Sequence, residues 1–397
     1  MRTIGVVTTA RSEYGLIRPL LRLIKDDPDL HLHLLVGGTH LSPQFGLTIS
    51  EIEADGFEIQ ARIESIQQGD TPKDVARAIG QGVLGFAEAY ASFQPDMLVV
   101  LGDRFEMYAA ALASVPFRIP LAHIHGGEVT EGALDDIWRH SITKMAHLHF
   151  VSTQTYGDRV RQLGEEDWRI NLVGALSLDN ARTVELLARA EVERRFDLTL
   201  AERFLLVTFH SETTEFEKAG AQCGELLAAL DEVDLPVLFT MPNADSGGSV
   251  IRKMIHEFVS ANSQAQAIEN LGTQGYLSVM ALASAMVGNS SSGIVEAAPF
   301  KLPVVNLGTR QKGRVLSANI INSGHGRAEI ATAIRRAASK AFRDTLSELQ
   351  SPYGDGHAAE RIVKVLKETK LDQRLLIKAF EDLAGSVRTR SGSDGIK

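Results

Sequence analysis

The chain has little cysteine, few aromatic residues and no long apolar run. Among its 397 residues there is one cysteine, Cys223, and 6% are aromatic. A single cysteine excludes an internal disulfide and a cysteine-based zinc cluster. No uninterrupted apolar stretch approaches the roughly 20 residues of a membrane helix, and the N-terminal MRTIGVVTTA lacks the apolar centre of a signal peptide. These absences predict a cytoplasmic protein without a membrane segment.

A basic excess is also missing. The chain carries 41 Lys and Arg against 50 Asp and Glu, a net charge of -9. This balance argues against a general affinity for nucleic acid, so an anionic ligand must be held by local groups. The apolar share of 44% and the charged share of 23% are ordinary for globular proteins. At about 150 residues per domain, the length predicts two domains.

Short Val, Ile and Leu runs alternate with longer amphipathic stretches, which is typical of parallel sheets covered by helices. In the first half we expect strands at residues 3–7, 31–36, 97–101, 120–124, 148–152 and 170–173, and helices near 14–25, 43–54, 72–93, 106–114, 134–146 and 156–163. In the second half we expect strands at 204–208, 237–241, 265–268, 285–288 and 303–306, and helices near 215–231, 250–259, 276–283 and 294–300. The fold class is therefore α/β, with two Rossmann-like doubly wound domains facing across a cleft.

The strand pattern lapses over residues 174–203, where the domains should join. We expect an N-terminal domain over 1–175 and a C-terminal domain over 176–384, which includes closing helices at 357–368 and 373–383. The polar, Gly- and Ser-rich residues 385–397 should form a disordered tail.

Two glycine-rich segments need separate interpretations. The segment Gly80 to Gly85 matches G-x-G-x-x-G but lies inside a helical pattern rather than between a strand and a helix. We therefore read it as helix packing and expect no dinucleotide cofactor. No Walker A motif is present, and Gly288 and Gly293 are too far apart for a serine-hydrolase elbow.

The segment GNSSSG, however, follows an expected strand and opens an expected helix. Its backbone N–H groups and its serine hydroxyls (Ser290, Ser291, Ser292) suit a phosphate, although an ordinary serine N-cap has the same appearance. Glu296 is placed to accept from two ribose hydroxyls. Arg11 and Arg310 each follow a strand and suit bidentate phosphate contacts, although single arginines are often only solvated.

Residues 101–144 concentrate charged groups between apolar runs. Asp103 and Arg104 follow one expected strand, and His125 and Glu128 follow the next. Open α/β sheets bind their ligands at such strand ends. Asp136, with Asp135 beside it, opens a helix, where acidic residues also complement the helix dipole.

His123 and His125 are spaced i, i+2 at a strand end, which predicts both rings on one face of the sheet. A zinc pair and a role in proton transfer both fit this spacing. The chain has no third-ligand motif such as H-E-x-x-H, so we expect no metal and favour proton transfer. His210 takes the position in the second domain that Asp103 takes in the first, where it can protonate a leaving phosphate.

Eight segments of the chain are considered together: TTARSEYG, LGDRFE, HIHGGE, DDIWRHSITK, TFHSETT, MPNAD, GNSSSGIVE and NLGTRQ. They resemble the signature segments of the hydrolysing UDP-N-acetylglucosamine 2-epimerases. The resemblance extends to about Leu366. It implies the GT-B-like fold of that family, with the nucleotide in the interdomain cleft and no cofactor. It also implies that a UDP-HexNAc is converted to UDP and free N-acetylmannosamine, or a 4-acetamido-6-deoxy analogue, in the biosynthesis of sialic or legionaminic acid.

The resemblance also implies roles for single residues. Asp103, His125, Asp136 and His210 would be catalytic, with Asp136 at the place of a glutamate in the non-hydrolysing enzymes. His125 departs from a glutamate found in the mammalian and non-hydrolysing enzymes, so the proton-transfer role of that glutamate does not carry over directly. The substrate-binding residues would be Arg11, Arg104, Glu128, Asn243, Ser290, Ser291, Ser292, Gly293, Glu296 and Arg310.

Elimination of UDP to a 2-acetamidoglucal, followed by hydration, needs acid/base groups at the sugar and cations at the diphosphate. The sequence offers both sets. Alternatives at this point are a non-hydrolysing epimerase, a GT-B glycosyltransferase, a metal-dependent hydrolase using His123 and His125, and a nucleotide-sugar sensor. We further expect a homo-oligomer, a dimer or tetramer, with no nucleic-acid or membrane partner.

Overall fold

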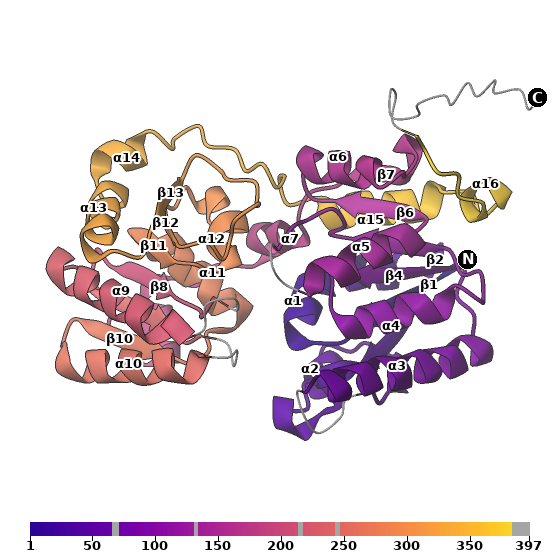
Figure 1. The fold of residues 1–397 in the computed structure, drawn as a ribbon, viewed down its shortest axis with the longest axis horizontal. Helices are drawn as coiled ribbons and strands as arrows, with labels where there is room; N and C mark the ends of the chain where they lie inside the picture. The colour runs from indigo at the N-terminus through magenta and orange to yellow at the C-terminus, as the bar shows by residue number, and fades with distance from the viewer. Residues whose placement is uncertain (66–70, 131–133, 213–216, 243–246, 383–397) are drawn as a thin grey trace, which may run out of the picture.

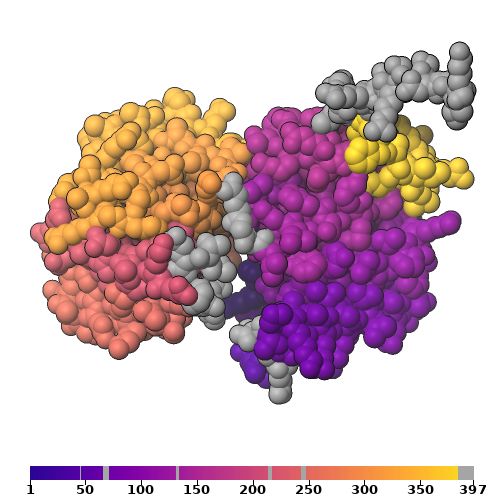
Figure 2. All heavy atoms as spheres, in the orientation of Figure 1, coloured from indigo at the N-terminus to yellow at the C-terminus, as the bar shows by residue number. Residues whose placement is uncertain are grey.

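Two α/β units lie side by side in the computed structural model, which describes residues 1–65, 71–130, 134–212, 217–242 and 247–382 (Figure 1). Within these residues each unit is built on one parallel sheet, the first with seven strands and the second with six. Figure 2 shows the two units as separate lobes with an indentation between them. The fold class predicted from the strand and helix pattern is confirmed.

The N-terminal sheet has the order β3-β2-β1-β4-β5-β6-β7. Its strands are β1 (Arg2–Thr8), β2 (Leu30–Gly37), β3 (Ile59–Ile63), β4 (Met97–Leu101), β5 (Leu121–Ile124), β6 (Leu148–Val151) and β7 (Ile170–Leu172). The helices of this part of the chain are α1 (Arg11–Asp26), α2 (Ile49–Ala54), α3 (Pro72–Ser92), α4 (Phe105–Ser114), α5 (Asp135–Met145), α6 (Gln154–Gln162) and α7 (Leu176–Thr183). Every residue of β4 and β5 is buried, because helices cover both faces of a doubly wound sheet.

The C-terminal sheet has the order β10-β9-β8-β11-β12-β13. Its strands are β8 (Leu205–Thr208), β9 (Val237–Thr240), β10 (Ala265–Ile268), β11 (Ala285–Gly288), β12 (Val304–Leu307) and β13 (Ile320–Ser323). The helices are α8 (Arg189–Phe196), α9 (Ala219–Val233), α10 (Gly248–Ala261), α11 (Gly272–Leu282), α12 (Ser291–Val295), α13 (Arg327–Ala337) and α14 (Lys340–Asp344). In each sheet the strand order reverses at its centre, between β1 and β4 and between β8 and β11. Ligands bind beyond the carboxyl ends of the strands at such a reversal.

The end of the chain returns to the N-terminal unit. Helix α15 (Ala358–Glu368) packs its apolar face against α1 and shares a core with it, which includes Leu20, Ile24, Ile362 and Leu366. Helix α16 (Gln373–Leu376) follows, and in Figure 1 both helices lie against the first unit. Our domain division had grouped these helices with the C-terminal domain, but their packing is with the N-terminal one. The exact domain boundaries remain a prediction.

Several other elements differ from expectation. The edge strands β3 and β13 were not predicted. Residues 43–54 do not form one helix, because Gly46 and Leu47 adopt left-handed backbone with φ of 83° and 47° and only Ile49–Ala54 is α-helical. Of the described residues 373–382, only Gln373–Leu376 form a helix, α16, and the predicted tail 385–397 lies outside the described residues.

Gly80 and Gly85 do lie inside a helix, α3, as predicted. Among the described residues, none of the helices combines the length and the apolar character needed to span a bilayer.

Candidate active site

A cavity of about 650 Å³ lies between the two units, at the carboxyl ends of both sheets. From the N-terminal unit it is lined by Ser12, Glu13, Leu16, Leu101, Gly102, Asp103, Arg104, His125, Glu128, Thr130, Asp135 and Arg139. From the later part of the chain it is lined by Ala175, Ser177, Glu212, Ser291, Ser292, Val295, Glu296, Thr309, Arg310, Gln311, Arg314 and Tyr353. Four carboxylates, a histidine and two arginines on one side of this space therefore face serines, two arginines and two glutamates on the other.

A second hollow of about 1010 Å³ continues the first. The two share Ser12, Leu16, Ser177 and Glu296. Arg11 lines this second hollow, where its Nε lies 3.0 Å from Oε1 of Glu51. The two adjoining hollows together extend from the acid/base groups around Asp103 and His125 to Arg11.

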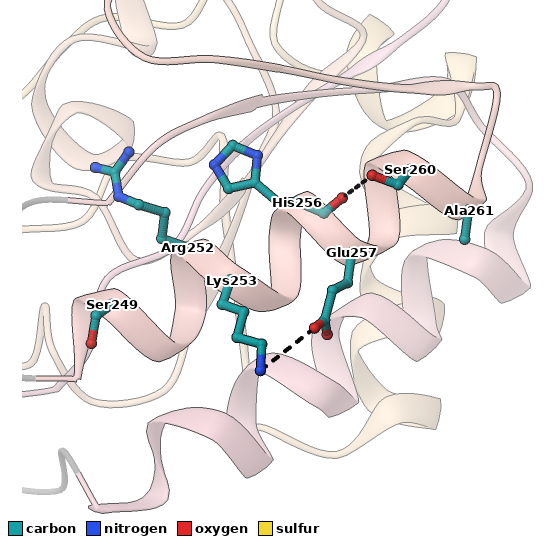
Figure 3. Close-up of a pocket in the computed structure, with 7 residues that line it drawn as sticks. All are labelled: Ser249, Arg252, Lys253, His256, Glu257, Ser260 and Ala261. Atoms are coloured by element: carbon teal, nitrogen blue, oxygen red, sulfur yellow. Dashed lines mark hydrogen bonds and ion pairs between the residues drawn. The ribbon is translucent and has the colours of Figure 1, made fainter.

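A third hollow lies on the outer face of α10, and the seven residues drawn in Figure 3 all belong to that helix. Its charged groups point outward, and Lys253 Nζ lies 3.8 Å from Oε1 of Glu257. It collects no groups from a second element and no buried titratable side chain, so it offers no basis for catalysis.

Arg139 organises the acidic wall of the cavity. This residue of α5 is only 2% exposed. Its guanidinium pairs with the carboxylates of Asp103, which follows β4, and of Asp136. It also donates to Oγ1 of Thr130 at 3.0 Å and to the carbonyl of Glu128 at 3.0 Å. A buried cation with this many partners fixes the orientation of both aspartates.

The two aspartates that open α5 have different surroundings. Asp136 accepts from the backbone N–H of Thr130 at 2.8 Å and pairs with Arg139, and it is not among the lining residues. Asp135 does line the cavity. Burial, and then the neighbouring Asp103 carboxylate, raise the pKa of Asp135 above its usual value. Of the two aspartates, Asp135 lines the cavity and Asp136 does not. The resemblance had implied a catalytic role for Asp136 instead.

His123 and His125 do not share a face, because His125 lies beyond the end of β5 and has a left-handed φ of 68°. His123 is fully buried; its Nε2 contacts the carbonyl of Gly102 at 2.8 Å and its Nδ1 contacts Oγ1 of Thr143 at 3.2 Å. Burial lowers the pKa of His123 to about 3. This ring is a neutral structural group, and only His125 reaches the cavity.

His125 is oriented by Glu128. Its Nδ1 lies 2.8 Å from Oε1 of Glu128, and its Nε2 has no hydrogen-bond partner among the described residues. Burial alone would raise the pKa of Glu128, but the interactions with His125, Arg314 and Arg139 outweigh it and lower this pKa to about 2. An ionised carboxylate on one ring nitrogen leaves the other free to exchange a proton.

Glu13 is a buried acid on the same wall. Its Oε2 accepts from the N–H groups of Thr9 at 3.0 Å and Ala10 at 3.1 Å. Its Oε1 has no hydrogen-bond partner among the described residues and lies 3.8 Å from Nε of Arg104. Arg104 in turn donates two hydrogen bonds to Glu106, at 2.9 and 3.2 Å. Burial raises the pKa of Glu13 to about 7, although Arg104 opposes this.

The opposite wall begins where β11 meets α12. Gly288 has a φ of 135°, and a Cβ there would overlap the carbonyl oxygen of Thr208 in β8, so only glycine permits this approach. Ser290 caps α12 and accepts from the N–H of Ser292. The hydroxyl of Ser292 lies 2.9 Å from that of Ser290 and 2.6 Å from that of Tyr276. Ser290 thus caps α12 as an ordinary serine N-cap, and it also belongs to a cluster of hydroxyl groups with Ser292 and Tyr276.

Charged groups flank this serine segment. Glu296 lines both hollows, and burial raises its pKa to about 7, with a hydrogen bond from Ser177 opposing the shift. Arg310 donates to the carbonyl of Asn289 at 3.1 Å. The loop before it is fixed by the buried Glu212, which accepts from the N–H of Thr309 at 2.9 Å and from its hydroxyl at 2.7 Å.

His210 follows β8 and is buried. The backbone N–H of His210 donates to Oδ1 of Asn289 at 2.7 Å, and Nδ2 of Asn289 donates to the backbone carbonyl of His210 at 2.9 Å. Burial, and then Arg310, lower the pKa of His210 to about 4. Its ring is neutral near pH 7, and it is not among the residues that line the two hollows.

The structure therefore brings most predicted site residues to one place. Those lining the cleft are Arg11, Asp103, Arg104, His125, Glu128, Ser291, Ser292, Glu296 and Arg310. Ser290 and Gly293 lie directly beside them in the capped start of α12, Asp136 and His210 do not line the hollows, and Asn243 falls outside the described residues.

Five charged residues that line the 650 Å³ cavity were not predicted as site residues: Glu13, Asp135, Arg139, Glu212 and Arg314. Glu13 and Glu212 lie in TTARSEYG and TFHSETT, the motifs that supplied Arg11 and His210, so their position beside a strand end was an available signal. Arg139 lies in DDIWRHSITK, which offered the same kind of signal, whereas Arg314 lies in a loop where no local pattern marks it.

Within the described ranges, no three His, Cys, Asp or Glu side chains are grouped so that they could hold a metal ion.

The sequence matches the profile described as UDP-N-acetylglucosamine 2-epimerase over residues 22–367. A Campylobacter jejuni protein named GDP/UDP-N,N'-diacetylbacillosamine 2-epimerase (hydrolyzing) is 39% identical over 96% of this chain and 99% of its own length. A Legionella pneumophila protein named UDP-N,N'-diacetylbacillosamine 2-epimerase (hydrolyzing) is 35% identical over 95% and 99%. Escherichia coli polysialic acid biosynthesis protein P7 is 32% identical over 96% and 98%.

The fold is similar to that of solved epimerases. The crystal structure of UDP-GlcNAc 2-epimerase from Neisseria meningitidis bound to UDP-GlcNAc has a TM-score of 0.77, at 16% identity over 93% of this chain and 100% of the other. The Methanocaldococcus jannaschii UDP-GlcNAc 2-epimerase in complex with UDP-GlcNAc and UDP has a TM-score of 0.73, at 18% identity over 92% and 100%. With its two parallel-sheet units, interdomain cavity and full-length similarity, this chain belongs to the UDP-N-acetylglucosamine 2-epimerase family.

Proposed function

We propose that the protein is a hydrolysing 2-epimerase that converts a UDP-HexNAc to UDP and the free 2-epimeric sugar. The observation that carries this proposal is the single cavity with acid/base groups on one wall and serines, Glu296 and Arg310 on the other. The names of the relatives at 39% and 35% identity support UDP-N,N'-diacetylbacillosamine as substrate, whose product would be 2,4-diacetamido-2,4,6-trideoxymannose.

The first step is elimination. No carbonyl lies next to C2 of a 2-acetamido sugar, so this C–H is not acidic and its proton leaves only as the C1–O bond breaks. We propose that Nε2 of His125 takes the C2 proton while the bonding electrons of C1–O leave with UDP. Glu128 holds the ring by its other nitrogen and stabilises the imidazolium that forms.

The second step is hydration of the resulting 2-acetamidoglucal. Water adds its oxygen to C1, and C2 receives a proton on the opposite face from the one that lost it. Asp135 is our proposed donor, since burial and Asp103 raise its pKa and keep a proton on it to higher pH. Asp103, held by Arg139, orients the water and accepts the proton that the water loses as its oxygen bonds to C1. Proton exchange with solvent then returns His125, Asp135 and Asp103 to their starting states. Asp136 then acts through Arg139 rather than on the sugar.

The diphosphate and ribose would lie against the opposite wall. Arg310, Arg11 and the hydroxyls of the serine segment are proposed to bind the diphosphate, with His210 as a neutral donor close to Arg310. Glu296, which lines both hollows, is proposed to accept from the ribose hydroxyls. Arg104, Asn243 and Gly293 keep the substrate-binding roles expected for them.

The test is incubation with UDP-N-acetylglucosamine and with UDP-N,N'-diacetylbacillosamine in D2O, with products identified by NMR and mass. We expect UDP and a free sugar of inverted C2 configuration, deuterated at C2. A mixture of two UDP-sugars without free sugar would instead establish a non-hydrolysing epimerase. UDP formed only with an added acceptor would establish a glycosyltransferase.

We also propose that the protein works in the cytoplasm as a homo-oligomer. Exposed apolar side chains on two helices that both pack against α4 support self-association, with Leu84 of α3 at 67%, Leu134 before α5 at 67% and Ile137 of α5 at 58% exposure. Light scattering should give a multiple of the 43.2 kDa chain mass. Replacing Leu84 and Ile137 by glutamate should shift it toward the monomer, and an unshifted mass would place the interface elsewhere.

A further inference from the structure

The carboxylate of Glu128 is shared between the two units. Its Oε1 lies 2.8 Å from Nδ1 of His125 and accepts from the hydroxyl of Ser152 at 3.0 Å, both in the N-terminal unit. Its Oε2 lies 3.4 Å from Nη1 of Arg314, which belongs to the C-terminal unit. One buried anion therefore faces an imidazole from its own unit and a guanidinium from the other.

The backbone next to Arg314 is docked onto the N-terminal unit. The N–H of Val315 donates to the hydroxyl of Tyr156 at 3.3 Å, and its carbonyl accepts from the hydroxyl of Tyr353 at 3.0 Å. The two tyrosine hydroxyls lie 3.1 Å apart. These contacts hold the Arg314 side chain, which is 17% exposed, against Glu128.

The same loop carries part of the opposite wall. Thr309 and Arg310 precede Arg314 in the segment that links β12 to β13, and Arg310 lines the cavity near the serine segment. A movement between the two units would therefore change the position of Arg310 and the distance from Arg314 to Glu128 together. The segment between β12 and β13 therefore links the surroundings of His125, the proposed base, to the proposed diphosphate site.

We propose that Arg314 is a positioning residue whose positive charge reduces the stabilisation that Glu128 gives to the imidazolium form of His125. Contact between the two units thereby keeps His125 in the neutral form that acts as a base. The inference rests on the proposed function only in the role given to His125. Arg314 does not act on the sugar; it acts through Glu128.

The sign of the effect follows from the charges around the ring. Glu128 stabilises the imidazolium form of His125, and a cation beside Glu128 offsets that stabilisation. The other charged or titratable groups around this pair are Arg139, whose Nη1 donates to the Glu128 carbonyl at 3.0 Å, the neutral His123, Tyr353, and the Asp103 and Asp135 carboxylates around Arg139. All of these belong to or pack on the N-terminal unit. Glu212, Glu296 and Arg310 of the later part of the chain line the same cavity, but among the described residues Arg314 is the cation of the second unit that contacts Glu128.

The experiment measures UDP release between pH 5 and 9 for the wild type, Arg314→Gln and Arg314→Lys. We expect Arg314→Gln to move the acidic limb of the kcat profile upward by about 0.5 to 1 pH unit, the shift expected for a lost nearby charge. Arg314→Lys should restore the limb, because lysine keeps the charge. Lys340→Gln, which removes one exposed cation outside the cleft, should leave the limb unmoved.

A uniform fall in kcat at every pH, with the limb in place, would overturn the proposal and reduce Arg314 to an interdomain latch. Failure of Arg314→Lys to restore the limb would overturn it as well. If Arg314→Gln does not fold, Glu128→Gln provides the complementary variant, and its acidic limb should move downward because a neutral amide no longer stabilises the imidazolium.

A direct titration keeps the inference separate from the proposed activity. In NMR spectra of histidine-labelled full-length protein, with His125 assigned through His125→Asn, the pKa of His125 should be about 0.5 to 1 unit higher in Arg314→Gln than in the wild type. Equal values would refute the inference even if the enzyme turns over. A shift without any turnover would refute only the proposed function.

Discussion

Asp135 and Asp136 are adjacent, yet their environments predict different consequences when each is replaced by asparagine. Asp135 lines the cavity, whereas Asp136 accepts from Thr130 and pairs with Arg139. Asp135→Asn should lower kcat by about 10²- to 10⁴-fold, the range for loss of a general acid or base, with little change in melting temperature. Asp136→Asn should lower the melting temperature, because it breaks a charge-assisted pair with a buried cation.

The measurement is steady-state UDP release together with thermal unfolding for both variants. Asp103→Asn serves as the matched comparison, because Asp103 both lines the cavity and pairs with Arg139, so it should lose turnover and stability together. A loss of kcat confined to Asp136→Asn would contradict the placement of Asp135 in the reaction space.

At the scale of residues, proximity to a strand end is what made the site predictable. Asp103 and His125 directly follow buried strands, so their meeting at one edge of the sheet follows from topology alone. The choice between Asp135 and Asp136 depends on how α5 is rotated, and the place of Arg314 depends on how two units dock. The same-face expectation for His123 and His125 was wrong, because an alternating strand register does not extend through a residue with left-handed backbone.

At the scale of elements, the turn that leads from β11 to α12 depends on one glycine. Gly288→Ala would place a Cβ against the Thr208 carbonyl at a φ of 135°, and we expect a cost of about 2 to 4 kcal/mol in the free energy of unfolding. Gly80→Ala is the matched control, since Gly80 lies in α3 with nothing near its Cβ position. It should stabilise by about 0.5 to 1 kcal/mol. Denaturant unfolding of both variants provides the comparison.

The central strands were predictable because burial on both faces makes them continuous apolar runs, as in β4 and β8. The edge strands β3 and β13 were not, because only part of each is buried and polar residues alternate within them. Residues 373–383 have a helical pattern, but Arg169 donates to the carbonyls of Arg374, Leu375 and Ile377. Tertiary hydrogen bonds of this kind replace helical ones, and no local pattern reveals them.

At the scale of the whole molecule, buried titratable groups make the free energy of unfolding depend on pH. Some groups lower it as the pH falls, and others lower it as the pH rises. Burial lowers the pKa of His40 to about 4, so this fully buried ring stabilises the fold above pH 6.5 and loses that contribution as the pH falls toward 4. His40→Gln should therefore lose less stability than the wild type between pH 7 and pH 5, by roughly 2 kcal/mol.

Glu13 should show the opposite sign. Its pKa is raised to about 7 by burial, so its contribution to stability is present below pH 4.5 and is lost as the pH rises through 7. Glu13→Gln should lose more stability than the wild type on acidification from pH 7 to pH 5. Chemical denaturation at several pH values checks both variants, and parallel curves for wild type and either variant would show that the group does not titrate in this window.

The packing of α15 against α1 has a consequence for biosynthesis. Leu20 and Ile24 of α1 are buried partly by Ile362 and Leu366, which are synthesised only after the second unit. The six strands described for the second unit, β8 to β13, all precede Asp344. The unit synthesised first is therefore completed last. Until then its α1 surface stays exposed to chaperones and to premature association with other nascent chains.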